Sequence, residues 1–175
     1  AAARARRGEA LMLEVAIHRA MPRDARVMAV LHASSFPKPW DETVMAQFSA
    51  GPDTVCLIAS SLDSSADSPA GFLIARRAAD EAELLTLAVA AHCRRAGLGK
   101  TLLEAVMIML GEAGVKQLFL EVEEGNEAAF RLYRALGAKA VGRRPRYYDS
   151  GADAAIFSLA LSARAADDGS SQREA

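Results

Sequence analysis

The sequence contains little of what would mark a disulfide-rich, metal-binding or membrane protein. Its 175 residues include two cysteines, Cys56 and Cys93, which are too few for a disulfide scaffold or a zinc site. The three histidines are scattered and show no metal-ligand spacing. No apolar run reaches the roughly 18 residues that a membrane-spanning helix needs. We therefore expect no metal and no membrane span, and we expect both cysteines to be free thiols in a reducing compartment.

The chain also lacks a strong charge of either sign. Its net charge is −1 at pH 7, so it has no overall basic field, and direct binding to nucleic acid is not favoured. The basic start, Ala1–Arg7, leads into a short apolar run that is broken by Glu14 and lacks a cleavage site, which argues against a signal peptide. The sequence therefore indicates a cytoplasmic protein in which any affinity for anions is local.

The composition that is present is that of a globular protein, with 51% hydrophobic and 25% charged residues. One domain is the default for a chain of this length, and we place it at residues 11–162. Residues 163–175 show no core pattern. We expect them, together with residues 1–10, to be disordered.

Hydrophobic periodicity divides this domain into helices and strands. The first expected helix begins at Pro22 and turns Val27, Val30 and Leu31 inward, and Asp41 caps the second. The expected helices cover residues 22–34, 42–49, 98–113 and 126–136. The expected strands cover residues 11–19, 54–60, 71–77, 82–89, 117–122, 138–143 and 154–161, with a hairpin loop at 62–69. This order favours an α/β (α+β) fold, a mixed sheet with helices on both faces, over a doubly wound parallel sheet.

The segment Arg94–Lys100, with the sequence RRAGLGK, joins an expected strand to an expected helix. Its glycines let a ligand approach the backbone closely, and a helix N-terminus there directs unpaired N–H groups at an anion. A P-loop would need glycine at position 94, and a dinucleotide motif would need glycine at position 102, where the chain has Leu102. The motif that fits is Arg-x-x-Gly-x-Gly. A phosphate site and a merely tight connection both stay open.

With its surroundings, this motif resembles the pyrophosphate-binding loop of the GNAT acyl-CoA-dependent N-acetyltransferases. Residues 11–162 as a whole resemble the RimI-like ribosomal-protein-alanine N-acetyltransferases of that superfamily. The other segments that carry the resemblance are Phe36-Pro37-x-x-Trp40, Leu87–Val89, Leu120–Val122, Asn126, Leu132-Tyr133-x-x-Leu136-Gly137 and Gly142–Tyr148. The chain departs from the family pattern where Lys38-Pro39 is inserted and where Ala138 replaces a phenylalanine. The resemblance implies a mostly antiparallel sheet of about six to seven strands, splayed at the cofactor site.

The resemblance also implies where acetyl-CoA, the co-substrate, binds. A splayed or bulged strand would offer backbone donors to its pantetheine arm. Asn126 would bond the same arm, although it can equally serve as a helix cap alone. The implied cofactor-binding residues are Leu87, Ala88, Val89, Arg94, Arg95, Ala96, Gly97, Leu98, Gly99, Lys100, Thr101 and Asn126.

Acetyl transfer to an amine needs a group that takes the amine proton. Glu121 ends an expected buried strand and holds the family position of this base; the alternative is that it pairs with an arginine at the strand end. Tyr133 holds the family position of the acid that protonates the leaving thiolate; a tyrosine on an apolar helix face is otherwise a core residue. Cys93 has no evident His or Asp partner, which favours direct transfer over a covalent enzyme intermediate.

Two loops are implied to bind the acceptor. The implied substrate-binding residues are Phe36, Trp40, Arg143, Tyr147 and Tyr148. The basic and aromatic residues of the second loop are also typical of a nucleic-acid stacking site, but the cluster is short and the chain is net acidic. A solvated loop with a structural tyrosine is the remaining alternative for this segment.

The function that the resemblance implies is acetyl transfer from acetyl-CoA to the N-terminal α-amino group of a protein, of the ribosomal-protein-alanine type. Two alternatives stay open. The acceptor could be a small-molecule amine, or the chain could be a non-catalytic acyl-CoA-binding sensor. The presence of both Glu121 and Tyr133 argues against the sensor.

Overall fold

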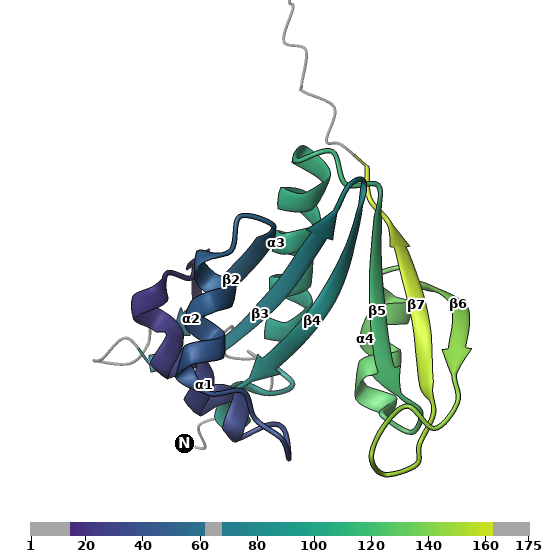
Figure 1. Ribbon diagram of the computed structural model, residues 1–175, viewed down its shortest axis with the longest axis horizontal. Coiled ribbons are helices and arrows are strands. Elements are labelled where there is room, and N and C mark those ends of the chain that lie inside the picture. Colours follow the sequence, from purple (N-terminus) through teal and green to yellow (C-terminus); the bar gives the residue numbers. More distant parts are fainter. Residues whose placement is uncertain (1–14, 62–67, 163–175) are drawn as a thin grey trace, which may run out of the picture.

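Seven strands form one sheet in the order β1-β2-β3-β4-β5-β7-β6 (Figure 1). The computed structural model describes residues 15–61 and 68–162. Its strands are β1 (Val15–Arg19), β2 (Thr54–Ser61), β3 (Ser68–Ala78), β4 (Glu81–Val89), β5 (Gln117–Glu123), β6 (Lys139–Arg144) and β7 (Ala154–Ala160). Neighbours pair antiparallel except β4 and β5, which are parallel. The predicted mixed, mostly antiparallel sheet is confirmed.

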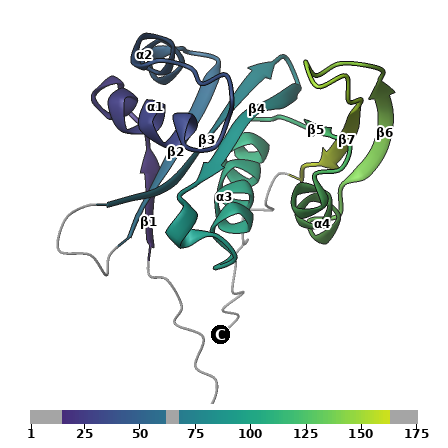
Figure 2. The ribbon, with the colours of Figure 1, turned by 90° about the horizontal axis from the view of Figure 1, so that it is seen from below.

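Four α-helices cover the sheet, α1 and α2 on one face and α3 and α4 on the other (Figure 2). They are α1 (Ala25–Ala33), α2 (Glu42–Ala50), α3 (Leu98–Glu112) and α4 (Glu127–Ala135), with short 3₁₀ turns at Pro22–Asp24 and Ala91–Cys93. Asp41 caps α2 as predicted, because its Oδ1 accepts the Val44 N–H at 2.9 Å. None of the described helices is long and apolar enough to cross a bilayer.

The core lies between the two helix layers, and β2 and β3 are buried on both of their faces. The predicted inward face of α1 is partly wrong. Leu31 is buried, but Met28 and His32 accompany it, and Val30 is 66% exposed. The helix is apolar on nearly every side, so the hydrophobic period does not determine which face packs on the sheet.

Several sequence-based expectations fall outside the described residues. These are the part of the expected first strand that precedes Val15, most of the loop expected at 62–69, and the two chain ends, which we expected to be disordered. The other predicted elements are present, with bounds that differ by up to three residues. The largest differences are at β3, which begins at Ser68, and at α1, which begins at Ala25 after a 3₁₀ turn at Pro22–Asp24.

The two central parallel strands separate soon after they meet. β4 and β5 pair over Glu81–Leu84 and Gln117–Leu120, and then diverge (Figure 1). On its other side, β4 carries a bulge, since the ladder with β3 leaves Leu85 unpaired. The predicted splay is therefore confirmed, and the bulge precedes Leu87–Val89 by two residues. Beyond Leu84 the β5 side of β4 has backbone donors and acceptors without a strand partner.

Candidate active site

A cleft of about 1040 Å³ lies between the end of β4, the start of α3 and the start of α4. Most of the predicted cofactor residues line it: Leu87, Ala88, Val89, Arg94, Arg95, Gly97, Leu98, Gly99, Lys100 and Asn126. Ala96 and Thr101 are not among its lining residues. The Thr101 hydroxyl instead donates to the Gly97 carbonyl at 3.2 Å, within the first turn of the helix. We call this space the donor cleft.

The donor cleft is built for an anion. Four cationic side chains line it, those of Arg94, Arg95, Lys100 and Arg131, and no carboxylate does so among the described residues. Gly97 starts α3 in a left-handed conformation (φ 81°), and no side chain caps this helix. The free N–H groups and the positive end of the helix dipole therefore act together with the four cations.

Sequence reasoning missed Arg131. Its signal was its helical spacing, because Ala128 and Leu132 also line the donor cleft and Arg131 lies on the same face of α4. Asn126 does cap α4, since its Oδ1 accepts the Ala129 N–H at 3.1 Å. Its bond to the cofactor stays a prediction.

Cys93 lines the same cleft but is almost completely buried. Burial raises the pKa of its thiol, which disfavours the thiolate that a nucleophile would need.

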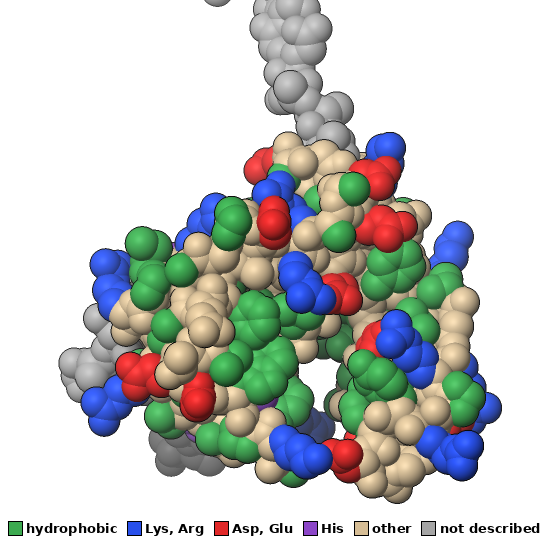
Figure 3. All heavy atoms as spheres, in the orientation of Figure 1, with side chains coloured by type: hydrophobic (Ala, Val, Ile, Leu, Met, Phe, Trp, Pro, Cys, Tyr) green, Lys and Arg blue, Asp and Glu red, His purple; other side chains and the backbone are tan. Residues whose placement is uncertain are grey.

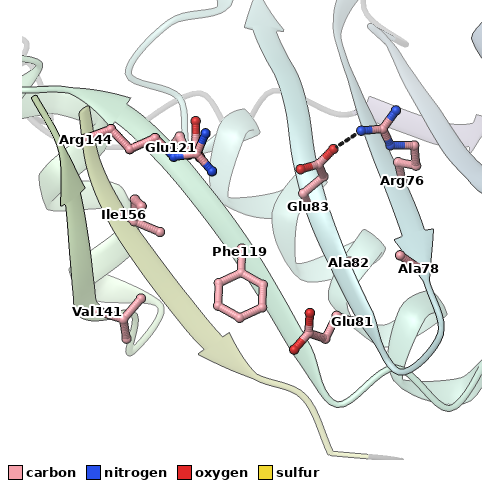
Figure 4. A pocket seen from close by; sticks show the side chains of 10 residues that line it. All are labelled: Arg76, Ala78, Glu81, Ala82, Glu83, Phe119, Glu121, Val141, Arg144 and Ile156. Atoms are coloured by element: carbon pink, nitrogen blue, oxygen red, sulfur yellow. Dashed lines mark hydrogen bonds and ion pairs between the residues drawn. The ribbon is translucent and has the colours of Figure 1, made fainter. Parts of the chain in front are cut away.

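A second cleft, of about 500 Å³, lies over the stretch in which β4 and β5 pair and extends to Glu121, just beyond it, on the face of β5 opposite to α4. Figure 4 shows its two walls, with Glu83 and Arg76 on one and Glu121 and Arg144 on the other. Phe119 and Glu121 reach this cleft because alternate β5 residues, Leu118 and Leu120, are buried on the other face. With Glu81, three carboxylates line what we call the acceptor cleft.

Glu121 is partly buried in the acceptor cleft. Arg144 donates from Nη2 to its Oε1 at 3.0 Å, so the ion pair considered as the alternative to a catalytic role is present. The guanidinium of Arg144 also lies 5.3 Å from the centre of the Tyr147 ring. The negative charge of Glu121 is the main cause that raises the pKa of Tyr147, and it adds to burial in raising the pKa of Tyr148. Both predicted acceptor tyrosines therefore lie near this carboxylate, although neither is among the lining residues of the acceptor cleft.

Tyr133 is buried on α4 and packs its ring edge-on against Phe157, with centroids 5.9 Å apart. Burial, and then the neighbouring Tyr148, raise its pKa to about 12. The hydroxyl keeps its proton at neutral pH, which is the state required of an acid. No hydrogen bond joins Tyr133 to Glu121. Tyr148 lies between them electrostatically, since it raises the pKa of Tyr133 while Glu121 raises the pKa of Tyr148.

The remaining predicted acceptor residues are dispersed. Phe36 lines the donor cleft, and Trp40 lies in a shallow groove beside α1. Arg143 lines neither cleft: its Nε is 2.7 Å from Glu124 Oε1, and its Nη2 is 2.7 Å from Asp153 Oδ2. The two loops nevertheless meet, through an ion pair between Lys38 and Asp149.

His32 is a residue that the sequence analysis did not select. Its ring stacks on Phe36 at 4.3 Å and on Trp40 at 4.9 Å, and its Nδ1 accepts the Trp40 N–H at 3.1 Å. The signal was its four-residue spacing from Phe36, whose N–H donates to the His32 carbonyl at 2.9 Å in the turn that follows α1. Burial lowers the pKa of His32, so the ring that organises this loop is neutral.

Comparison with known proteins assigns the chain to a family. Residues 25–138 match the Acetyltransferase (GNAT) family. The chain belongs to this family. It is therefore a GNAT acetyltransferase, and membership implies acetyl-CoA as the acyl donor.

Relatives of this GNAT enzyme include the [ribosomal protein bS18]-alanine N-acetyltransferase of Escherichia coli K12, 41% identical over 96 residues. That match covers 53% of this chain and 65% of the relative. An N-alpha-acetyltransferase of Sulfurisphaera tokodaii is 35% identical over 79 residues, 45% of this chain and 47% of the relative. The crystal structure of the E. coli ribosomal-protein-S18-alanine N-acetyltransferase superposes with a TM-score of 0.77 at 30% identity, over 89% of this chain and 98% of that one. This GNAT chain is thus RimI-like in sequence and fold.

Proposed function

We propose that this enzyme transfers the acetyl group of acetyl-CoA to the N-terminal α-amino group of a protein, in the manner of the ribosomal-protein-alanine type. One observation carries the proposal: two clefts of different charge border β4. The donor cleft, at the end of β4, holds four cations and an uncapped helix N-terminus, which suit a pyrophosphate. The acceptor cleft, over the start of β4, holds Glu81, Glu83 and Glu121. Arg76 and Arg144 also line it and pair with Glu83 and Glu121, so the cleft has one more carboxylate than cations, which suits a cationic amine.

The splay lets the two substrates meet. Figure 3 shows an opening between the half of the molecule built on β4 and the half built on β5. Arg94, Arg95 and the start of α3 hold the pyrophosphate in the donor cleft, and the unpaired edge of β4 orients the arm that carries the thioester. The acyl carbon then lies within reach of an amine that enters from the acceptor cleft.

Glu121 and Tyr133 move the two protons of the reaction. Glu121 takes a proton from the acceptor ammonium, directly or through one water, and the neutral amine attacks the thioester carbon. Tyr133 gives its proton to the sulfur that leaves when the carbon–sulfur bond breaks. The attacking nitrogen releases its second proton to solvent as the amide forms, and Tyr133 regains a proton from solvent. An α-amino group, with a pKa near ~8, loses its proton much more readily than a lysine near ~10.4, which favours N-terminal acceptors. The relatives named for alanine and α-amino acceptors support the same choice.

The test is to measure thiol release from acetyl-CoA with a panel of acceptors. Peptides that begin with alanine should win, and mass spectrometry should place the acetyl group on their α-nitrogen. Matched peptides with a blocked N-terminus and an internal lysine are the control. A faster reaction with small amines would replace the proposed acceptor, and binding of acetyl-CoA without thiol release would indicate a sensor.

Glu121→Gln separates chemistry from binding. Since the amide cannot take the proton, turnover should fall by ~10²-fold or more, the usual scale of a general base. Glu121 does not line the donor cleft, so the affinity for acetyl-CoA should stay at the wild-type value. Steady-state kinetics and calorimetric titration check the two parts, and unchanged turnover would remove Glu121 from this role.

A further inference from the structure

We infer that Arg144 is a positioning residue for Glu121, which it holds by one carboxylate oxygen so that the other faces the acceptor amine. The inference rests on the proposed function, because it takes Glu121 as the group that receives the amine proton. Arg144 reaches Glu121 from the end of β6, across β7, and both side chains line the acceptor cleft (Figure 4).

The contact uses half of the carboxylate. Arg144 Nη2 donates to Oε1 at 3.0 Å, and no ion pair among the described residues uses Oε2. An ionised carboxylate has about four acceptor positions, so the bond from Arg144 and the hydrogen bond with Tyr147 fix the orientation of the group and leave room for a further donor.

Tyr147 holds Arg144 in turn. The guanidinium lies 5.3 Å from the centre of the Tyr147 ring, within the range of a cation–π contact. Arg144, Glu121 and Tyr147 therefore form a closed set of three, each in contact with the other two. A planar guanidinium can stack on the ring and donate in its plane at once, which a lysine ammonium cannot do.

The neighbouring Arg143 shows that this arrangement is not general to the strand. Arg143 pairs with Glu124 and Asp153 and lines neither cleft. The two arginines are similarly exposed, at 59% and 54% of their side chains, and each forms ion pairs from the end of β6. Arg143→Gln is therefore a matched control for the loss of an arginine and its ion pairs from this hairpin.

The first experiment reports the contact without any turnover. The chain has three tyrosines, so ring-labelled tyrosine gives three carbon signals that can be followed by NMR through a pH titration. Glu121 raises the pKa of Tyr147 and Arg144 lowers it. Arg144→Gln should therefore raise the pKa of Tyr147, Glu121→Gln should lower it, and Arg143→Gln should leave it at the wild-type value.

The second experiment is a double-mutant cycle in kcat/KM, with whichever amine gives the fastest thiol release. Arg144→Gln should lower kcat/KM by about 10-fold or more in the wild type and have little effect in Glu121→Gln, because Arg144 acts through Glu121. Arg144→Lys, which keeps the charge, should recover part of the loss. Arg143→Gln should change kcat/KM by the same factor in both backgrounds, whatever that factor is.

The outcomes separate the inference from the proposed function. If Arg144→Gln costs the same factor with and without Glu121 and shares one Tyr147 pKa with Arg143→Gln, Arg144 does not position Glu121, even if the wild type acetylates N-terminal peptides. If the wild type prefers small amines, the proposed acceptor is wrong, and the coupling between Arg144 and Glu121 still supports the inference.

Discussion

Gly99→Ala should make the free protein more stable and its complex with CoA weaker. A Cβ at this position would lie 3.5 Å from Leu132 Cδ2, 3.8 Å from Leu87 Cδ2 and 3.9 Å from Val89 Cγ2, all ordinary contacts. The residue lies in the first turn of α3, where alanine loses less backbone entropy than glycine, by up to about 0.5–1 kcal/mol. For a chain of this size, that free energy raises Tm by up to about 4 °C.

The same methyl group narrows the donor cleft, which Gly99, Leu87, Val89 and Leu132 all line. An extra carbon in a well-filled space costs about 1–3 kcal/mol. At 1.4 kcal/mol for each tenfold change, CoA should bind about 5- to 150-fold more weakly. Stability and affinity should thus change in opposite directions.

Gly97→Ala is the matched control. Its added Cβ would have no atom within 4 Å, but the residue sits at φ +81°. A side chain there costs roughly 1–2 kcal/mol in backbone strain, so Tm should fall. Thermal unfolding without ligand and calorimetric titration with CoA measure both quantities for each variant. A Gly99→Ala protein with a raised Tm and the wild-type Kd for CoA would show that no ligand approaches the backbone here.

Three further predictions follow from buried groups. Tyr133→Phe should lower kcat by ~10²-fold with little change in acetyl-CoA affinity. Because the pKa of Tyr133 is about 12, the activity of the wild type should not decline below pH 9 through ionisation of this hydroxyl. Stopped-flow thiol release measures the loss of kcat and the pH dependence. Cys93→Ala should keep normal turnover in the same assay, since burial raises the pKa of its thiol; an inactive, folded variant would indicate a covalent mechanism. Burial lowers the pKa of His32 from 6.5, so the unfolded chain binds this proton at higher pH than the folded protein does. Urea unfolding should therefore show stability falling as the pH drops below 6.5, and less so in His32→Phe.

Much of the donor side could be predicted from the sequence because its determinants are local. These determinants follow one another in the sequence: the strand before Arg94, the glycines and the apolar stripe of α3. The residues of each one predict its own local conformation. The splay was expected from the resemblance alone. The bulge at Leu85 could not be placed, since it depends on how β4 aligns with β3 and not on the composition of β4.

The acceptor side was harder because it depends on pairing between distant segments. The sequence analysis selected Arg143, whereas Arg144 is the arginine that reaches Glu121. Side chains alternate along a strand, so the choice between two adjacent arginines depends on strand register. The ladder between β6 and β7 shifts between Ala140 and Gly142, and no local pattern in the sequence predicts that shift.

The ion pair between Lys38 and Asp149 joins the loop after α1 to the loop after β6. It thereby closes the open end of the space between β4 and β5 into a ring. Lys38 is one of the two residues, Lys38-Pro39, that are inserted relative to the family pattern. Both side chains are more than three-quarters exposed, so the ion pair contributes at most about 1 kcal/mol. Molecules in which the ion pair is formed therefore outnumber those in which it is broken by about five to one at most. A free chain end can be threaded into a closed ring, whereas the middle of a polypeptide enters only when the ring is broken. Salt screens the bond and reduces this difference, so with the proposed N-terminal acceptors we predict that the advantage of chain ends over internal segments weakens as ionic strength rises.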